Sequence, residues 1–154
     1  MASIRYWRLL SLLLVLTTGF FSSCNKDDNN TGVTPQPSGP AMISALINGE
    51  YWSLSSGYAE LQPTANMRIN CSGSYGSINI TVSPFNGVQT YALDGFTKIV
   101  YLEDNVQYNS IRGQIQITEN APGSVSGRFN CELISTTGST SVVFTEGEFS
   151  VPKQ

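Results

Sequence analysis

A period of two in the apolar residues is the feature of this sequence that most constrains its fold. Apolar residues occupy every second position in the stretches 67–71, 78–82 and 129–133, and Ile111, Ile115 and Ile117 share one phase. No sustained apolar stripe with helical spacing occurs from residue 41 onward. Alternation of this kind is typical of strands that bury one face. It predicts one all-β domain over residues 41–154, which is enough chain for one core and too little for two.

Turn signals separate these stretches at intervals of about ten residues. Asn48-Gly49 and Asp94-Gly95 each lie between two apolar runs and predict two-residue hairpins, because such pairs tolerate positive φ. Short links force neighbouring strands to be antiparallel. We expect a single antiparallel domain of about nine or ten strands, folded as a β-sandwich or, alternatively, as a flattened up-and-down barrel.

The first 23 residues have the order of a secretory signal peptide. Arg5 and Arg8 precede an apolar run at 9–21, and small residues follow up to Cys24. The run is shorter than the roughly 20 residues that a spanning helix needs, so a cleaved signal at 1–23 is favoured over a permanent transmembrane segment. Residues 24–40 are then a lipidated Cys followed by a flexible linker, because 25–40 offer almost nothing to bury.

Two short motifs around the cleavage point suggest where the protein is located. Phe21-Ser22-Ser23-Cys24 resembles the lipobox of bacterial lipoproteins, in which the Cys is acylated and becomes the new N-terminus. Lys26, Asp27 and Asp28 resemble the export signal of Bacteroidota surface lipoproteins. These resemblances imply an outer-membrane protein that acyl chains anchor and that is exposed at the cell surface. The alternatives are an ordinary signal peptide with an incidental Cys24 and a linker that merely starts with solvated charges.

Composition excludes several classes of function. The chain contains no His, which rules out Ser-His-Asp and Cys-His catalysis and His-ligated zinc. Eleven acidic residues against eight basic ones, with no basic cluster, argue against a nucleic-acid partner. The carboxylates are scattered, and neither a catalytic pair nor the spacing of a calcium loop stands out. We therefore expect no enzyme activity, no metal and no cofactor.

Cys71 and Cys131 both fall on the inward phase of their predicted strands. Outside the cytoplasm two such thiols can be oxidised to a disulfide, provided that the fold brings their backbones close together. The alternative is two separate small core residues. The sequence leaves both readings open.

Aromatic residues are the candidate binding residues. Amphipathic rings at exposed positions are what sugar-binding and protein-binding faces use. The alternative is that these rings fill the core or its rim. The candidates are Trp52, Tyr58, Tyr75, Tyr101 and Tyr108.

Four segments resemble one family of small Bacteroidota lipoproteins, domain-of-unknown-function family 6252. They are Ile47–Trp52, with a V-N-G-x-x-W-like start; Gly113–Thr118, of G-x-I-x-I-T type; Val125–Phe129, of V-S-G-x-F type; and Val142–Phe149, ending in T-E-G-x-F. The resemblance implies a surface lipoprotein of unassigned activity and supplies no catalytic residues.

The expected function is a non-catalytic binding module whose partner is a glycan or an envelope protein. One alternative is a glycoside hydrolase that uses two carboxylates, which would need to lie roughly 5 to 10 Å apart in a cleft. Another is a purely structural envelope component. A binding face predicts a cluster of exposed aromatics with no perturbed carboxylates, whereas a structural role predicts neither this cluster nor a carboxylate pair.

Overall fold

The computed structural model describes residues 41–74 and 76–154, and every regular element in them is a β-strand. No helix in these ranges is long and apolar enough to cross a membrane. The predicted signal peptide, Cys24, Lys26, Asp27, Asp28 and the linker lie outside the described residues, and so does Tyr75.

The described residues form ten strands, in agreement with the predicted number. They are β1 (Ile43–Ile47), β2 (Glu50–Leu54), β3 (Ser56–Gln62), β4 (Asn66–Gly73), β5 (Gly76–Val82), β6 (Thr90–Ala92), β7 (Lys98–Glu103), β8 (Val106–Asn120), β9 (Ser124–Ser135) and β10 (Ser141–Pro152). Alternating burial runs through most of them, as the period of two predicted.

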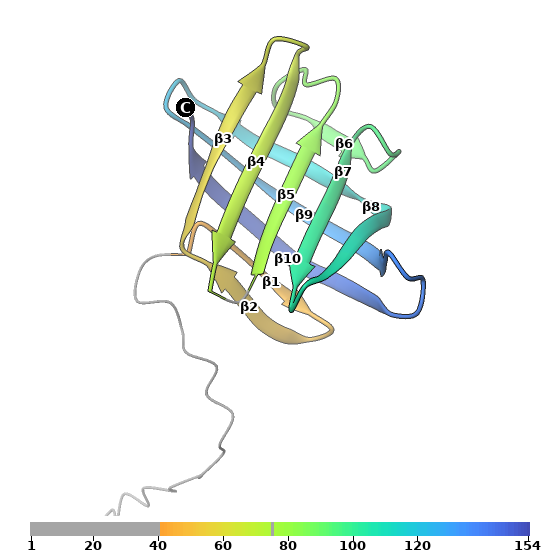
Figure 1. Cartoon of the computed structure of the whole chain (residues 1–154). Helices are drawn as coiled ribbons and strands as arrows, with labels where there is room; N and C mark the ends of the chain where they lie inside the picture. Colours follow the sequence, from red (N-terminus) through yellow and green to blue (C-terminus); the bar gives the residue numbers. More distant parts are fainter. Residues whose placement is uncertain (1–40, 75) are drawn as a thin grey trace, which may run out of the picture. The chain divides into compact units, whose positions relative to one another are not determined.

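All ten strands belong to one antiparallel sheet, in the order β2-β1-β10-β9-β8-β7-β5-β4-β3, with β6 paired to β8. Figure 1 shows this sheet folded over itself, so that β3, β4, β5 and β7 cross above β8, β9 and β10. The end of β10 then meets β3, where the amide of Gln154 donates to the carbonyl of Ala59 at 2.9 Å beside a parallel bridge from Ala59 to Lys153. The all-β antiparallel prediction is confirmed.

The two layers face each other as in a sandwich, but their continuity makes the domain a flattened, nearly closed barrel, which was the alternative prediction. β8 is the reason for this continuity. Its first residues, from Val106 to Asn109, pair with β7, and the strand then runs on beside β9 as far as Asn120. One long strand thus carries the hydrogen-bonded ladder from one layer into the other.

One of the two predicted hairpins is present and the other is not. Asn48 and Gly49 have φ of 52° and 91° and join β1 to β2 as a tight hairpin. Asp94-Gly95 also forms a turn, in which the Asp94 carboxylate accepts from the amide of Thr97 at 2.8 Å. The flanking strands do not pair, however, because β6 pairs with β8 while β7 pairs with β5 and β8. The prediction of a hairpin at Asp94-Gly95 was therefore wrong.

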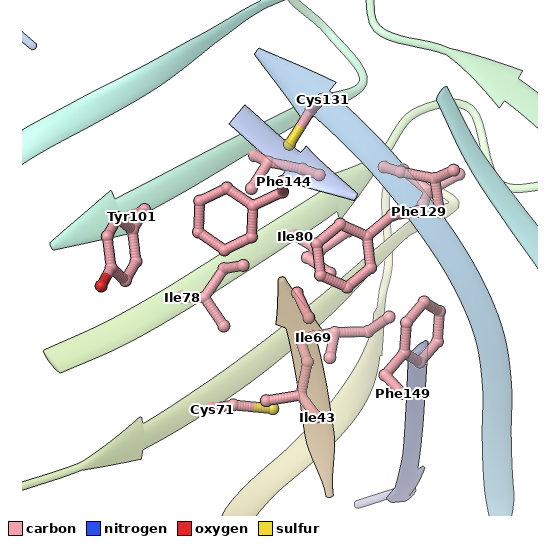
Figure 2. Close-up of a cluster of buried hydrophobic side chains, with 14 of the residues drawn as sticks. Ile43, Ile69, Cys71, Ile78, Ile80, Tyr101, Phe129, Cys131, Phe144 and Phe149 are labelled. Atoms are coloured by element: carbon pink, nitrogen blue, oxygen red, sulfur yellow. The ribbon is translucent and has the colours of Figure 1, made fainter. Parts of the chain in front are cut away.

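The space between the layers is filled by a continuous apolar core. Ile69, Ile80, Ile99 and Ile115 are fully buried, and each such side chain stabilises the fold by roughly 1.5–3 kcal/mol. Figure 2 shows the aromatic part of this core. In the part of the chain that the structure describes, the core residues run from Ile43 to Val151, and they form one continuous cluster within residues 41–154.

Candidate functional site

One of the predicted binding aromatics belongs to the core, and two others pack against it. Tyr101 is fully buried because it shares the inward phase of β7 with Ile99, so its assignment as a binding residue was wrong. Trp52 is half-buried and contacts Tyr101 edge-on, with ring centroids 5.5 Å apart, and Tyr108 packs on the same ring at 5.9 Å. Burial also raises the pKa of the Tyr101 phenol. These rings stabilise the barrel rather than forming an exposed face.

Cys71 and Cys131 are buried free thiols in this structure, so the candidate disulfide is not formed in it. Figure 2 shows the two side chains at opposite ends of the aromatic cluster. Burial raises the pKa of each thiol to about 12. A thiolate is the reactive form, so neither sulfur is poised for chemistry at neutral pH.

The outer face of the sheet carries a polar groove, which we call the β10 groove. Its volume is about 570 Å³. Five strands contribute to it: β1, β2, β8, β9 and β10. The lining residues are Ser44, Ala45, Leu46, Tyr51, Gln114, Gln116, Arg128, Phe129, Asn130, Glu146, Gly147 and Glu148.

A β-bulge in β10 lies on this groove. The register passes from Phe144 opposite Cys131 to Gly147 opposite Phe129, so Thr145 and Glu146 together face the single residue Asn130. β1 shows the same shift, because only Ala45 lies between the positions paired with Thr145 and Glu148. Bulges kink a strand and redirect its side chains. Glu146 also has a φ of 52°, a left-handed conformation that is uncommon outside glycine.

Amide and charged side chains stand in cross-strand rows along the β10 groove. Gln116 is opposite Arg128, and Arg128 is opposite Glu148, with which it forms an ion pair at 3.1 Å. Gln114 is opposite Asn130 in the next row. The ion pair is mostly exposed, so it adds little to stability, roughly 0–1 kcal/mol, and its groups stay accessible to a ligand.

Tyr51 provides the aromatic side chain of the β10 groove. It lies on β2, opposite Leu46, and 62% of it is exposed. An exposed ring beside amides can stack on an apolar ligand face while the amides bond the ligand's polar rim. Of the predicted aromatics, Tyr58 lines an outer groove, and that groove is on the other layer.

Sequence reasoning missed the residues of the β10 groove, although a signal was present. Gln114 and Gln116 alternate with buried isoleucines, and Arg128 and Asn130 alternate with buried residues of β9, so all four point outward by phase. What the sequence did not show is that these two outward sets are adjacent. Register supplies that information, and register depends on turns and bulges.

No group of three or more His, Cys, Asp or Glu side chains able to hold a metal ion occurs in the part of the chain that the structure describes. The groove offers amide side chains, the Arg128–Glu148 ion pair, the Glu146 carboxylate and the exposed Tyr51 ring.

These features define a class of protein: a small, nearly closed antiparallel barrel with a polar groove across its outer face. Residues 39–152 match the family described as a domain of unknown function (DUF6252), and the chain belongs to that family, as its motifs predicted. Nothing among the curated proteins or the solved structures matches the chain.

Proposed function

We propose that this protein is a Bacteroidota surface lipoprotein, anchored in the outer membrane through Cys24, whose barrel is a non-catalytic module that binds a glycan in the β10 groove. The N-terminal motifs support the anchor and the location. The groove supports the binding role. No part of the proposal requires a cofactor.

The observation that carries the binding proposal is the exposed Tyr51 beside rows of amides in one hollow. Sugars present hydroxyl groups around the ring edge and apolar C–H groups on the ring face. Gln114, Gln116 and Asn130 each donate and accept, which suits hydroxyl groups. A protein partner would call for a desolvated apolar centre, which protein interfaces have and this groove lacks. A glycan is therefore favoured over an envelope protein.

Glycan-array screening of residues 41–154, followed by titration with the glycan that is bound, tests the binding role. Tyr51→Ala and Gln116→Ala should each weaken binding at least about fivefold, which corresponds to roughly 1 kcal/mol. Leu61→Ala is the matched control, because Leu61 is as exposed as Tyr51 and is not among the lining residues. Equal affinity of all three variants would refute the assignment of the groove.

A carboxylate-dependent glycoside hydrolase is the second candidate, because Glu146 and Glu148 line the same groove. Both lie on β10, and Glu148 is held by Arg128. A hydrolase would release reducing sugar from the bound glycan and lose that activity in Glu146→Gln and Glu148→Gln. Binding without product release, in the unmodified protein as well as in both variants, supports the non-catalytic role.

The anchor is tested separately in cells. Palmitate labelling should require Cys24, so Cys24→Ser should be unlabelled and released from membranes. Replacing Lys26, Asp27 and Asp28 with Ala should leave the protein labelled but protect it from protease added outside the cell. Equal protease sensitivity of this triple variant and the parent would show that the three residues carry no export signal.

A further inference from the structure

A second groove lies on the other layer of the barrel, and we call it the amide groove. It is hollowed into the outer face of β3, β4, β5 and β7, with Gln107 from the start of β8, and its volume is about 410 Å³. Its lining residues are Ser56, Gly57, Tyr58, Asn70, Cys71, Ser72, Ser77, Ile78, Asn79, Val100, Leu102 and Gln107. None of these residues lines the β10 groove. Figure 1 shows β3, β4 and β5, which carry most of these residues, on the opposite layer from β9 and β10.

The centre of the amide groove is a row of side chains held in place across the strands. Tyr58 is opposite Asn70, and Asn70 is opposite Asn79. The Asn79 Nδ2 group donates to Asn70 Oδ1, and Thr81 Oγ1 donates to Asn79 Oδ1 at 3.2 Å. The bond between the two asparagines uses only one hydrogen of Asn79 Nδ2. Within the described residues, the second hydrogen and the Asn70 Nδ2 group have no side-chain acceptor and can donate to a ligand.

Every side chain that lines the amide groove is uncharged. The nearest ionic row, Glu60 beside Arg68, lies two positions further along β3 and β4. A charged ligand would lose its bound water in this groove and find no opposite charge to pair with, and this loss costs free energy. Hydroxyl groups can instead replace their hydrogen bonds to water with hydrogen bonds to the fixed amides. The apolar residues Val100 and Leu102 stand beside the amides, with Val100 directly opposite Asn79. They can contact the apolar face of a sugar ring while the amides bond its hydroxyl groups.

We propose that the amide groove is a second saccharide site, separate from the β10 groove and selective for uncharged sugars, in which Asn70 and Asn79 bond hydroxyl groups and Tyr58 supplies the ring. The β10 groove carries Glu146, Glu148 and Arg128, so the two sites differ in charge and can select different glycans. The assignment stands on its own, because it uses none of the residues of the β10 groove.

The test is NMR titration of residues 41–154, following the side-chain NH₂ signals of Asn70 and Asn79. The probes are the neutral hexamers of cellulose, laminarin, mannan and xylan, with hexagalacturonate as the charged counterpart. At least one neutral hexamer should shift both signals while hexagalacturonate does not. Tyr58→Ala and Asn79→Ala should weaken that binding at least about fivefold. Tyr51→Ala should leave it unchanged, and the rest of the spectrum reports whether each variant is folded.

Three results would overturn the second site: no shift with any neutral hexamer, equal shifts with hexagalacturonate, or shifts confined to Gln114, Gln116 and Asn130. The last would leave the β10 groove as the binding site. Shifts of Asn70 and Asn79 that survive Tyr51→Ala, together with an unresponsive β10 groove, would instead support the amide groove and count against the proposed role of the β10 groove.

Discussion

Glycines on the inward phase of this barrel stand directly opposite larger core side chains. The pairs are Gly127 with Phe149, Gly147 with Phe129, Gly57 with Cys71 and Gly113 with Cys131. A Cβ atom on Gly127 would lie 2.4 Å from the Phe149 ring, so the ring occupies the space that a side chain would need. The V-S-G-x-F and T-E-G-x-F motifs thus interlock, because the glycine of each makes room for the phenylalanine of the other.

Replacement of Gly147 by Ala tests this interlock. The added Cβ would lie 2.6 Å from the Phe129 carbonyl oxygen and 2.7 Å from its ring, so both strand and ring must shift. We expect the free energy of unfolding in urea to fall by about 1–3 kcal/mol. Gly123→Ala is the control, because nothing lies within 4 Å of its Cβ position, and it should change stability by less than about 1 kcal/mol. Equal stability of the two variants would contradict the interlock.

At the scale of the strand, the bulge in β10 is a single extra residue. The burial pattern alternates strictly except at Thr145 and Glu146, which are both exposed. Removing one of them restores unbroken alternation, with Phe144, Gly147 and Phe149 still inward. The bulge is therefore not needed for the core, and its position on the groove suggests that it is kept to shape that surface.

Deletion of Glu146 should accordingly leave a folded barrel that no longer binds in the β10 groove. The deletion also removes a residue held at positive φ, so the thermal midpoint should stay near that of the parent or rise. Deletion of Ser150 is the matched control. It leaves the bulge in place and makes Phe149 and Val151 neighbours, so one of them must face solvent, and the thermal midpoint should fall well below that of the parent. Circular dichroism melts measure whether each deletion variant folds, and glycan titration measures whether it binds. An unfolded Glu146 deletion would contradict the inference that the core does not need the bulge.

How far the sequence predicts these elements depends on whether the information is local. Alternation and the Asn48-Gly49 turn depend on neighbouring residues, and both were predicted correctly. The hairpin predicted at Asp94-Gly95 does not form, because β6 pairs with β8 instead of β7. No local signal reveals a strand partner that lies some twenty residues away. Asp104 and Asn105, both at positive φ, form a hairpin turn between β7 and β8 that was not among the predicted hairpins. The grooves were out of reach for the same reason, because each joins outward residues of strands that only the sheet order brings together.

At the scale of the whole molecule, the core of this barrel holds titratable groups in their neutral forms. The Cys71 and Cys131 thiols have pKa values raised by burial from an ordinary value of 9.0 to about 12. Above pH 9 the unfolded chain releases both thiol protons while the folded barrel keeps them. Each thiol therefore contributes stability that is complete below pH 9 and is lost as the pH rises toward 12.

The free energy of unfolding should thus fall steeply between pH 9 and pH 12, with each thiol adding at most about 1.4 kcal/mol per pH unit to the slope. Urea titrations at closely spaced pH values measure this slope. Cys71→Ala and Cys131→Ala should each make it shallower by up to that amount, whatever they cost at pH 7, because Tyr101 and the other titrating groups are common to parent and variants. A disulfide between the two residues would leave no thiol to titrate in the parent and one free thiol in each variant, so variant slopes steeper than the parent's would reveal that bond. Parallel slopes in all three proteins would show that the thiols are not the free, buried groups seen here.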